Sequence, residues 1–163
     1  MTINNDPIHI LMREHEQASQ ALAQLENAVL SIDQTGFSVE AFEQIGKAIR
    51  FIGTTFREHD KKEERYLFNL LEKHQAGLTQ DYRREHRELW SAIDLLMSCV
   101  RDVELGRLHG LSLRELIQTS KLVVELLRAH IRKENTILFP MVKELLSELE
   151  YDQLRNSIAN SHA

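Results

Sequence analysis

The sequence predicts an all-α fold, an up-down-up-down four-helix bundle with an internal two-fold pseudo-repeat and a short C-terminal helix. Three observations support this. Apolar residues recur at helical spacing along most of the chain, and no stretch shows the alternation of a half-buried strand. Only two prolines and six glycines interrupt the pattern. A shift of 71 residues also aligns the first predicted helix pair with the second.

The length sets the domain organisation. The chain has 163 residues, of which 42% are hydrophobic, and this is enough for one domain with a substantial core. We therefore expect a single domain over residues 1–163. The bundle should occupy residues 7–146 approximately, and the short terminal helix residues 148–160 approximately.

The first helix pair is bounded by capping residues. Asp6-Pro7 is typical of an N-cap followed by proline at the first helical position, and the apolar spacing continues to about Ser31. Residues 33–36 then form a predicted loop. Ser38 is the expected N-cap of the second helix, which should end near His74.

The second pair is bounded in a similar way. Thr79 should open the third helix and Gly106 should end it, with residues 108–111 as the next turn. The sequence Ser112-Leu113-Arg114-Glu115 is typical of a capping box and predicts the start of the fourth helix. A second capping box, Ser147-Glu148-Leu149-Glu150, predicts the short C-terminal helix.

Composition narrows the class of protein and its location. The net charge is −5 and basic residues are always mixed with acidic ones, so we expect no nucleic-acid partner. The single cysteine, Cys99, cannot form an internal disulfide, which fits a reducing compartment. The polar N-terminus lacks a signal peptide's apolar segment, and no apolar run approaches the ~18 residues of a membrane span. We expect a cytoplasmic protein without membrane contact.

The repeat carries a chemical motif. His59 precedes Glu63 by four residues, as His130 precedes Glu134, so on a helix each imidazole and carboxylate lie on one face. The same shift aligns the segment that ends at His15 with the one that ends at His86. We interpret six residues as one metal site: His15, His59, Glu63, His86, His130 and Glu134.

The alternative is a buried hydrogen-bond network of histidines and glutamates. A histidine in an apolar stripe is commonly a satisfied core residue, but here each of four helices contributes one. Burying such groups without partners would cost several kcal/mol per ionised group, and bound cations would remove that cost. Imidazole with carboxylate suits iron, manganese or zinc rather than calcium or magnesium.

Six ligands favour two ions, because one catalytic zinc typically takes three protein ligands. If Glu63 and Glu134 each bridge both ions, each ion also takes two histidines. A bridging oxide or hydroxide adds a fifth ligand and leaves one position open on each octahedral ion. Neutral imidazoles leave net positive charge on the ions, which favours an anionic or reducible small ligand. Asp60 should point about 100° away from His59 and be solvated, and Trp90 should shield the site from water.

These residues resemble the hemerythrin-like, HHE cation-binding domain family. The resemblance covers about Ile8 to Met141 and rests on the six residues above, on the Leu-Phe pair after each glutamate, and on Pro140. It implies a non-haem di-iron centre, bridged by oxygen and two carboxylates, that handles O₂, NO or peroxide. Manganese or zinc are possible substitutes for iron.

The chain departs from oxygen-carrying hemerythrins in two places. Trp90 stands where they have a further histidine, and Asn135 where they have an aspartate. The set is more similar to that of the di-iron repair-of-iron-centres proteins and the iron-sensing domains. The resemblance therefore implies binding of, or reaction with, a small diatomic ligand or peroxide, in sensing or stress response. The alternatives are a redox enzyme at the same centre (peroxidase-like, NO-reducing or repairing iron centres) and an iron-responsive or structural domain. Whether turnover occurs, and which protein partner is involved, stays open.

Overall fold

The computed structural model describes residues 5–107 and 110–161, and within these ranges it contains helices and no strand. The label η marks π-helical segments. In chain order the elements are α1 (Pro7–Thr35), α2 (Val39–Phe51), η2 (Ile52–Phe56), α3 (Arg57–Lys62), η3 (Glu63–Leu67), α4 (Phe68–His74), α5 (Gln80–Glu104), α6 (Gly110–Lys133), η4 (Glu134–Leu138), α7 (Phe139–Leu145) and α8 (Glu148–Asn160).

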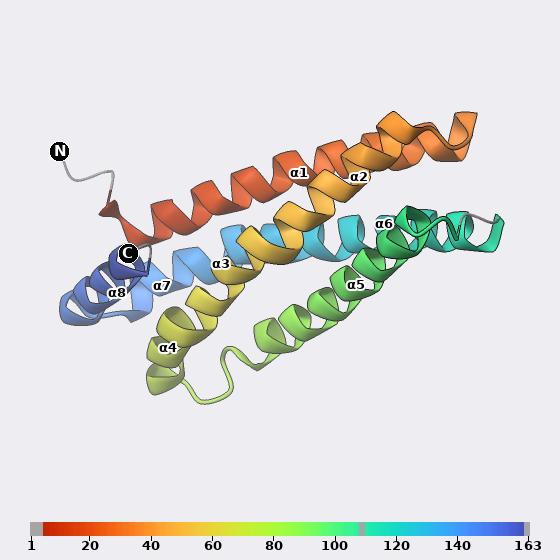
Figure 1. Ribbon diagram of the computed structural model, residues 1–163. Helices are drawn as coiled ribbons and strands as arrows, with labels where there is room; N and C mark the ends of the chain where they lie inside the picture. Colours follow the sequence, from red (N-terminus) through yellow and green to blue (C-terminus); the bar gives the residue numbers. More distant parts are fainter. Residues whose placement is uncertain (1–4, 108–109, 162–163) are drawn as a thin grey trace.

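Several of these elements join into long rods. The segments from α2 to α4 follow one another without a break, as do those from α6 to α7. Successive rods run in opposite directions, and α8 lies at the end of the bundle where α1 begins (Figure 1). α1 packs against α2 and α6, and α5 packs against the same two helices. The predicted all-α bundle is confirmed.

Three of the predicted helix caps are confirmed. Asp6 and Ser38 accept hydrogen bonds from the first turns of α1 and α2, and Ser147 forms the full capping box of α8. The loop predicted at residues 33–36 was wrong in extent, because α1 continues to Thr35. Gly36, with φ of 90°, ends it, in a left-handed conformation that glycine adopts without strain.

The start of the fourth helix was also misplaced. α6 begins at Gly110, two residues before the predicted capping box at 112–115. Of the turn predicted at 108–111, residues 108 and 109 lie outside the described residues. The helix signal in the sequence was correct, but its first residue was not, because helix ends are the least determined part of such patterns.

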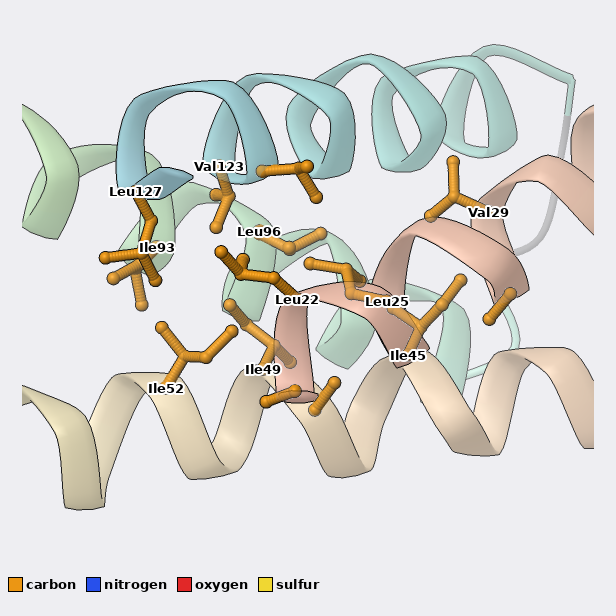
Figure 2. Packing of buried hydrophobic residues seen from close by; sticks show 14 of the residues in the cluster. Leu22, Leu25, Val29, Ile45, Ile49, Ile52, Ile93, Leu96, Val123 and Leu127 are labelled. Carbon is orange, nitrogen blue, oxygen red and sulfur yellow. The ribbon is translucent and has the colours of Figure 1, made fainter. Parts of the chain in front are cut away.

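Two apolar clusters flank a polar layer. The larger one fills the space between α1, α2, α5 and α6, where aliphatic side chains such as Leu22, Ile49, Ile93 and Val123 point toward one another (Figure 2). The smaller one lies at the other end, around Phe68, and includes residues of α7 and α8. Along α1, His15 falls between the last residue of the smaller cluster and the first of the larger one.

In the described part of the chain, no helix is both long enough and apolar enough to cross a membrane.

Candidate metal centre

The six residues of the predicted site lie together in the polar layer, and each is at most 3% exposed. Each rod of the bundle contributes one imidazole. They are placed as follows: His15 on α1, His59 on α3, His86 on α5, His130 on α6, Glu63 at the start of η3 and Glu134 at the start of η4.

Both glutamates open a π-helical turn. η3 runs from Glu63 to Leu67 and η4 from Glu134 to Leu138, so the two turns are related by the same 71-residue shift as the motifs. The backbone is α-helical from each histidine to its glutamate, which keeps the pair on one face, and changes its period directly afterwards. π turns of this kind are frequent at functional sites.

His15 and His59 form one pair of imidazoles. His59 Nε2 lies 3.1 Å from Glu63 Oε1, and His15 Nε2 lies 3.0 Å from Glu134 Oε2. One donor atom from each of these four residues lies within 4.8 Å of the others. We call this group the His15 position.

His86 and His130 form the second pair. His130 Nε2 lies 2.9 Å from Glu134 Oε1, and His86 Nε2 lies 3.4 Å from Glu63 Oε2. We call these two imidazoles, with the two glutamates and Asp60, the His86 position. Each glutamate turns one oxygen toward each pair of imidazoles, which is what a carboxylate bridging two ions requires.

Hydrogen bonds on the far side of the rings orient all four imidazoles. Nδ1 of each ring donates to an oxygen on another segment, which directs Nε2 toward the centre. The donor–acceptor pairs are His59 to Glu14 at 2.6 Å, His130 to Glu85 at 2.8 Å, His86 to Glu64 at 2.8 Å and His15 to Asn135 at 2.7 Å. Lys62 also donates to Glu14, as Lys133 does to Glu85.

Aromatic rings fix the same imidazoles by packing. Phe139 stacks on His15 with 5.2 Å between ring centroids, and Phe68 stacks on His86 at 5.5 Å. These phenylalanines belong to the Leu-Phe pairs that follow the two glutamates, so each half of the repeat supplies the ring that supports the other half's histidine.

Nine buried nitrogen and oxygen atoms of this cluster, all of kinds that can bind a metal ion, have no hydrogen-bond partner in the part of the chain that the structure describes. They are Nε2 of the four histidines, both oxygens of Glu63 and Glu134, and Oδ1 of Asp60. The short contacts between Nε2 and carboxylate oxygens lack hydrogen-bond geometry, which argues against a simple hydrogen-bond network. Because an unpaired buried polar atom costs about 1–3 kcal/mol, convergence of nine indicates a bound group, and this donor set fits transition-metal ions.

The electrostatics of the cluster favour cations. Burial disfavours a charged His59, but the charge of Glu63 and the hydrogen bond to Glu14 outweigh it and raise the pKa of His59 to about 10. Burial likewise opposes charge on His130, yet Glu134 and Glu85 raise its pKa to about 9. The pKa values of Glu63 and Glu134 stay below the usual range despite burial, because imidazoles surround both carboxylates.

Asp60 was expected to be solvated, and this was wrong. It is 1% exposed, Trp90 Nε1 donates to its Oδ2 at 2.7 Å, and its Oδ1 lies 3.7 Å from His86 Nε2. Burial raises the pKa of this carboxyl group. A helix between two neighbours buries an arc of 100° or more, so His59 faces α1 while Asp60 faces α5.

One signal in the sequence points to Asp60. It precedes Glu63 by three residues, and residues three and four apart share a helix face, so both Asp60 and His59 adjoin Glu63. Trp90, which was expected to shield the site, is half-buried, stacks on His86 with 5.8 Å between ring centroids and anchors Asp60.

Comparison with known proteins identifies the family. The sequence model of one protein family, the hemerythrin HHE cation binding domain, matches residues 6–142. This range contains every residue of the His15 position and of the His86 position. Comparison with individual curated proteins found no match. The buried histidines and carboxylates form two groups that can hold metal ions, as the family description implies. The chain belongs to the hemerythrin HHE cation-binding domain family.

Proposed function

We propose that this protein holds a non-haem di-iron centre and uses it to bind, or react with, a small ligand such as O₂, NO or peroxide, in sensing or stress response. The observation that carries the proposal is the convergence of nine unpartnered buried donor atoms, four nitrogens and five oxygens, on one interior layer. Two donor groups, each with two imidazoles and sharing Glu63, support two ions rather than one.

The donor chemistry supports iron. Neutral imidazoles and carboxylates together suit iron, manganese or zinc, and a pair of iron ions would supply redox chemistry together with a Lewis-acidic binding site. The chain's own residues would hold the ions through Nε2 and the carboxylates. The hydrogen bonds at Nδ1 keep each Nε2 directed inward, and the phenylalanine rings keep water from the imidazole faces.

A surface cleft supports access for a small ligand. It has a volume of about 510 Å³, lies between α1 and α3, and is lined partly by His59 and by Phe56, which stacks on His59. Lys61 and Arg65 also line the cleft. Of the residues that form the His15 position, His59 alone lines the cleft, and we propose that ligands approach from this side.

Metal content and spectroscopy test the proposal. Protein reconstituted with Fe²⁺ should hold two iron ions per chain, and its oxidised form should absorb visible light, which a zinc form does not. Addition of NO to the reduced protein should change the spectrum. A matched control is His74→Ala, which removes a histidine that bonds to Glu150 away from the site. One ion per chain, or a spectrum indifferent to NO and peroxide, would contradict the proposal.

A second candidate function is an iron-responsive domain whose fold reports metal supply. The burial of the site favours it, because loss of metal leaves several ionised side chains in the interior between two apolar clusters. Circular dichroism with and without a chelator, together with assays for turnover of NO or peroxide, distinguishes an iron-responsive domain from a redox enzyme. A large loss of helix without metal supports the responsive domain, whereas sustained turnover of NO or peroxide supports a redox enzyme.

A further inference from the structure

The two metal positions differ in their carboxylates. Asp60 adjoins only the His86 position, where one donor atom each from Asp60, Glu63, His86 and His130 lie within 4.8 Å of one another. The repeat offers no equivalent at the His15 position, because the 71-residue shift places Ile131 there, a residue of the apolar core.

The environment of Asp60 is that of a metal ligand. Trp90 donates to Oδ2, which fixes the carboxylate, and Oδ1 has no hydrogen-bond partner among the described residues although it is buried next to His86 Nε2. Ligating carboxylates are typically held in this way through their second oxygen. A purely structural acceptor for the indole would not need a second buried oxygen without a partner.

The acceptors of the Nδ1 hydrogen bonds also make the His86 position more acidic than the His15 position. His86 donates to the carboxylate Glu64, whereas His15 donates to the neutral amide of Asn135 at the position related by the repeat. A carboxylate behind a ligating histidine raises its basicity and strengthens its bond to metal. The His86 position thus has two more acidic groups than the His15 position, namely Asp60 and Glu64.

We propose that Asp60 is a seventh metal ligand and that it makes the two positions unequal, with the His86 position holding the more tightly bound ion. This rests on the proposed dinuclear site. Added negative charge close to a divalent cation in a buried site favours its binding strongly, since water screens the interaction poorly there. The ion at the His15 position is then the first to be lost to a chelator.

Calorimetric titration of metal-free protein with Co²⁺ tests this. Wild-type protein should take up two ions in two steps that differ in affinity by at least about tenfold, the range that metal-site partners typically contribute. In Asp60→Asn the tighter step should weaken by about tenfold or more, while the weaker step and the stoichiometry stay unchanged. The asparagine amide still accepts from Trp90 but is a poor ligand for the ion.

Two control variants separate ligation from structure. Trp90→Phe removes the indole hydrogen bond but leaves the carboxylate, so it should weaken the tighter step less than Asp60→Asn does. Asp94→Asn removes the charge of an exposed aspartate that pairs with Arg57, and should titrate like wild type. Thermal melting of each metal-free variant checks that the fold is kept.

The outcomes distinguish this proposal from the one it rests on. Wild-type protein that takes up fewer than two Co²⁺ ions overturns the dinuclear site and the role of Asp60 with it. Two ions in the wild type with an unchanged Asp60→Asn titration overturn only the role of Asp60. If Trp90→Phe and Asp60→Asn weaken the tighter step equally, Asp60 is a structural acceptor and the proposal fails.

Discussion

The two halves of the repeat, Pro7–His74 and Gln80–Leu145, contribute the same set of buried histidines and glutamates, but the residues around these groups differ between the halves. Both supply a histidine followed by a glutamate one turn later, a π turn that starts at the glutamate, and a lysine-paired glutamate behind one imidazole. They differ around His86, where Asp60, Glu64 and Trp90 correspond to Ile131, Asn135 and Ser19.

The shared features are those that the two proposed ions would need from both halves. A bridging carboxylate must reach both positions, so the repeat preserves Glu63 and Glu134 together with the backbone turn that places them. The differences gather at one imidazole. The internal repeat therefore explains why the bundle contains two similar donor groups, and the residues around His86 are the reason why we expect the two groups to bind metal unequally.

The largest effect should come from the two bridging candidates. Glu63→Ala and Glu134→Ala should each lose both ions, because each carboxylate turns an oxygen toward both positions, whereas His15→Ala should lose one. Metal analysis after exhaustive dialysis measures the stoichiometry. Glu58→Ala, which removes an exposed glutamate of the same rod, is the control. Retention of two ions in Glu63→Ala would show that Glu63 is not a bridge.

The next largest effect should come from pH, because protons compete with metal ions for the imidazoles of both halves. The pKa of His59 is raised to about 10 and that of His130 to about 9, so both imidazoles are protonated in the metal-free protein at neutral pH. Burial opposes charge on His86 as well, but the nearby carboxylates, Asp60 first, raise its pKa. Each ion must displace the protons on the imidazoles that bind it, so the affinity at each position should rise by at least about tenfold per pH unit below pH 9.

The stability of the metal-free protein should show the opposite trend. Because the folded pKa values lie above the ordinary 6.5, the charged imidazoles stabilise the fold fully below pH 6.5, and this contribution disappears as pH rises through 9 to 10. Chelator competition and urea unfolding, each followed against pH, measure the two trends. Metal affinity independent of pH would show that the imidazoles are already neutral.

A smaller and symmetric effect should follow from removing the carboxylates behind the repeat-related histidines. Glu14→Ala and Glu85→Ala each leave an imidazole without its Nδ1 partner, and loss of such partners typically costs 10- to 100-fold in metal affinity. The two variants should weaken binding to a similar degree. Glu16→Ala, an exposed residue of α1, is the control. A large effect in one variant alone would show that the halves differ here as well.

The sequence predicted the parts of the site that the repeat preserves. The convergence of His15, His59, His86 and His130 with two glutamates could be predicted because helical spacing and duplication both point to it. Asp60 was misjudged because its neighbours depend on which helices lie on either side, and the duplication offers no second copy to compare.

Other features depend on geometry that no local pattern records. The π turns at η3 and η4 are backbone rearrangements whose sequences contain no glycine or proline. The partners Glu64 and Asn135 are adjacent in sequence to the glutamates but bond to histidines on other rods, so only the packing of the bundle identifies them. Helix ends at Thr35 and Gly110 likewise depend on how far the rods extend in the fold.

The two halves also begin differently. Asp6 caps α1 by accepting from Ile8 N at 3.0 Å, and the same oxygen accepts from the hydroxyl group of Tyr151 on α8 at 2.6 Å. The second half has no such side-chain cap at Thr79. Glu72 instead accepts from Thr79 N at 2.9 Å and from its hydroxyl group at 2.6 Å, which orders the turn before α5.

The smallest effect should therefore come from Asp6→Ala, which should lower the free energy of unfolding by about 1 kcal/mol, the typical cost of a lost N-cap. Asp6→Asn should retain most of that stability because the amide oxygen still caps the helix. Tyr151→Phe removes only the hydrogen bond between Asp6 and α8, and so measures its share of the effect.

Burial opposes charge on Asp6, but the hydrogen bonds from Tyr151 and the backbone lower its pKa below 3.8. The charged cap thus stabilises the fold above pH 3.8, and the difference from Asp6→Ala should shrink in acid as pH falls through the lowered pKa. Urea unfolding against pH measures this. Metal stoichiometry should stay at two, since His15 is more than two turns away, and loss of an ion in Asp6→Ala would show that the cap and the metal centre are coupled.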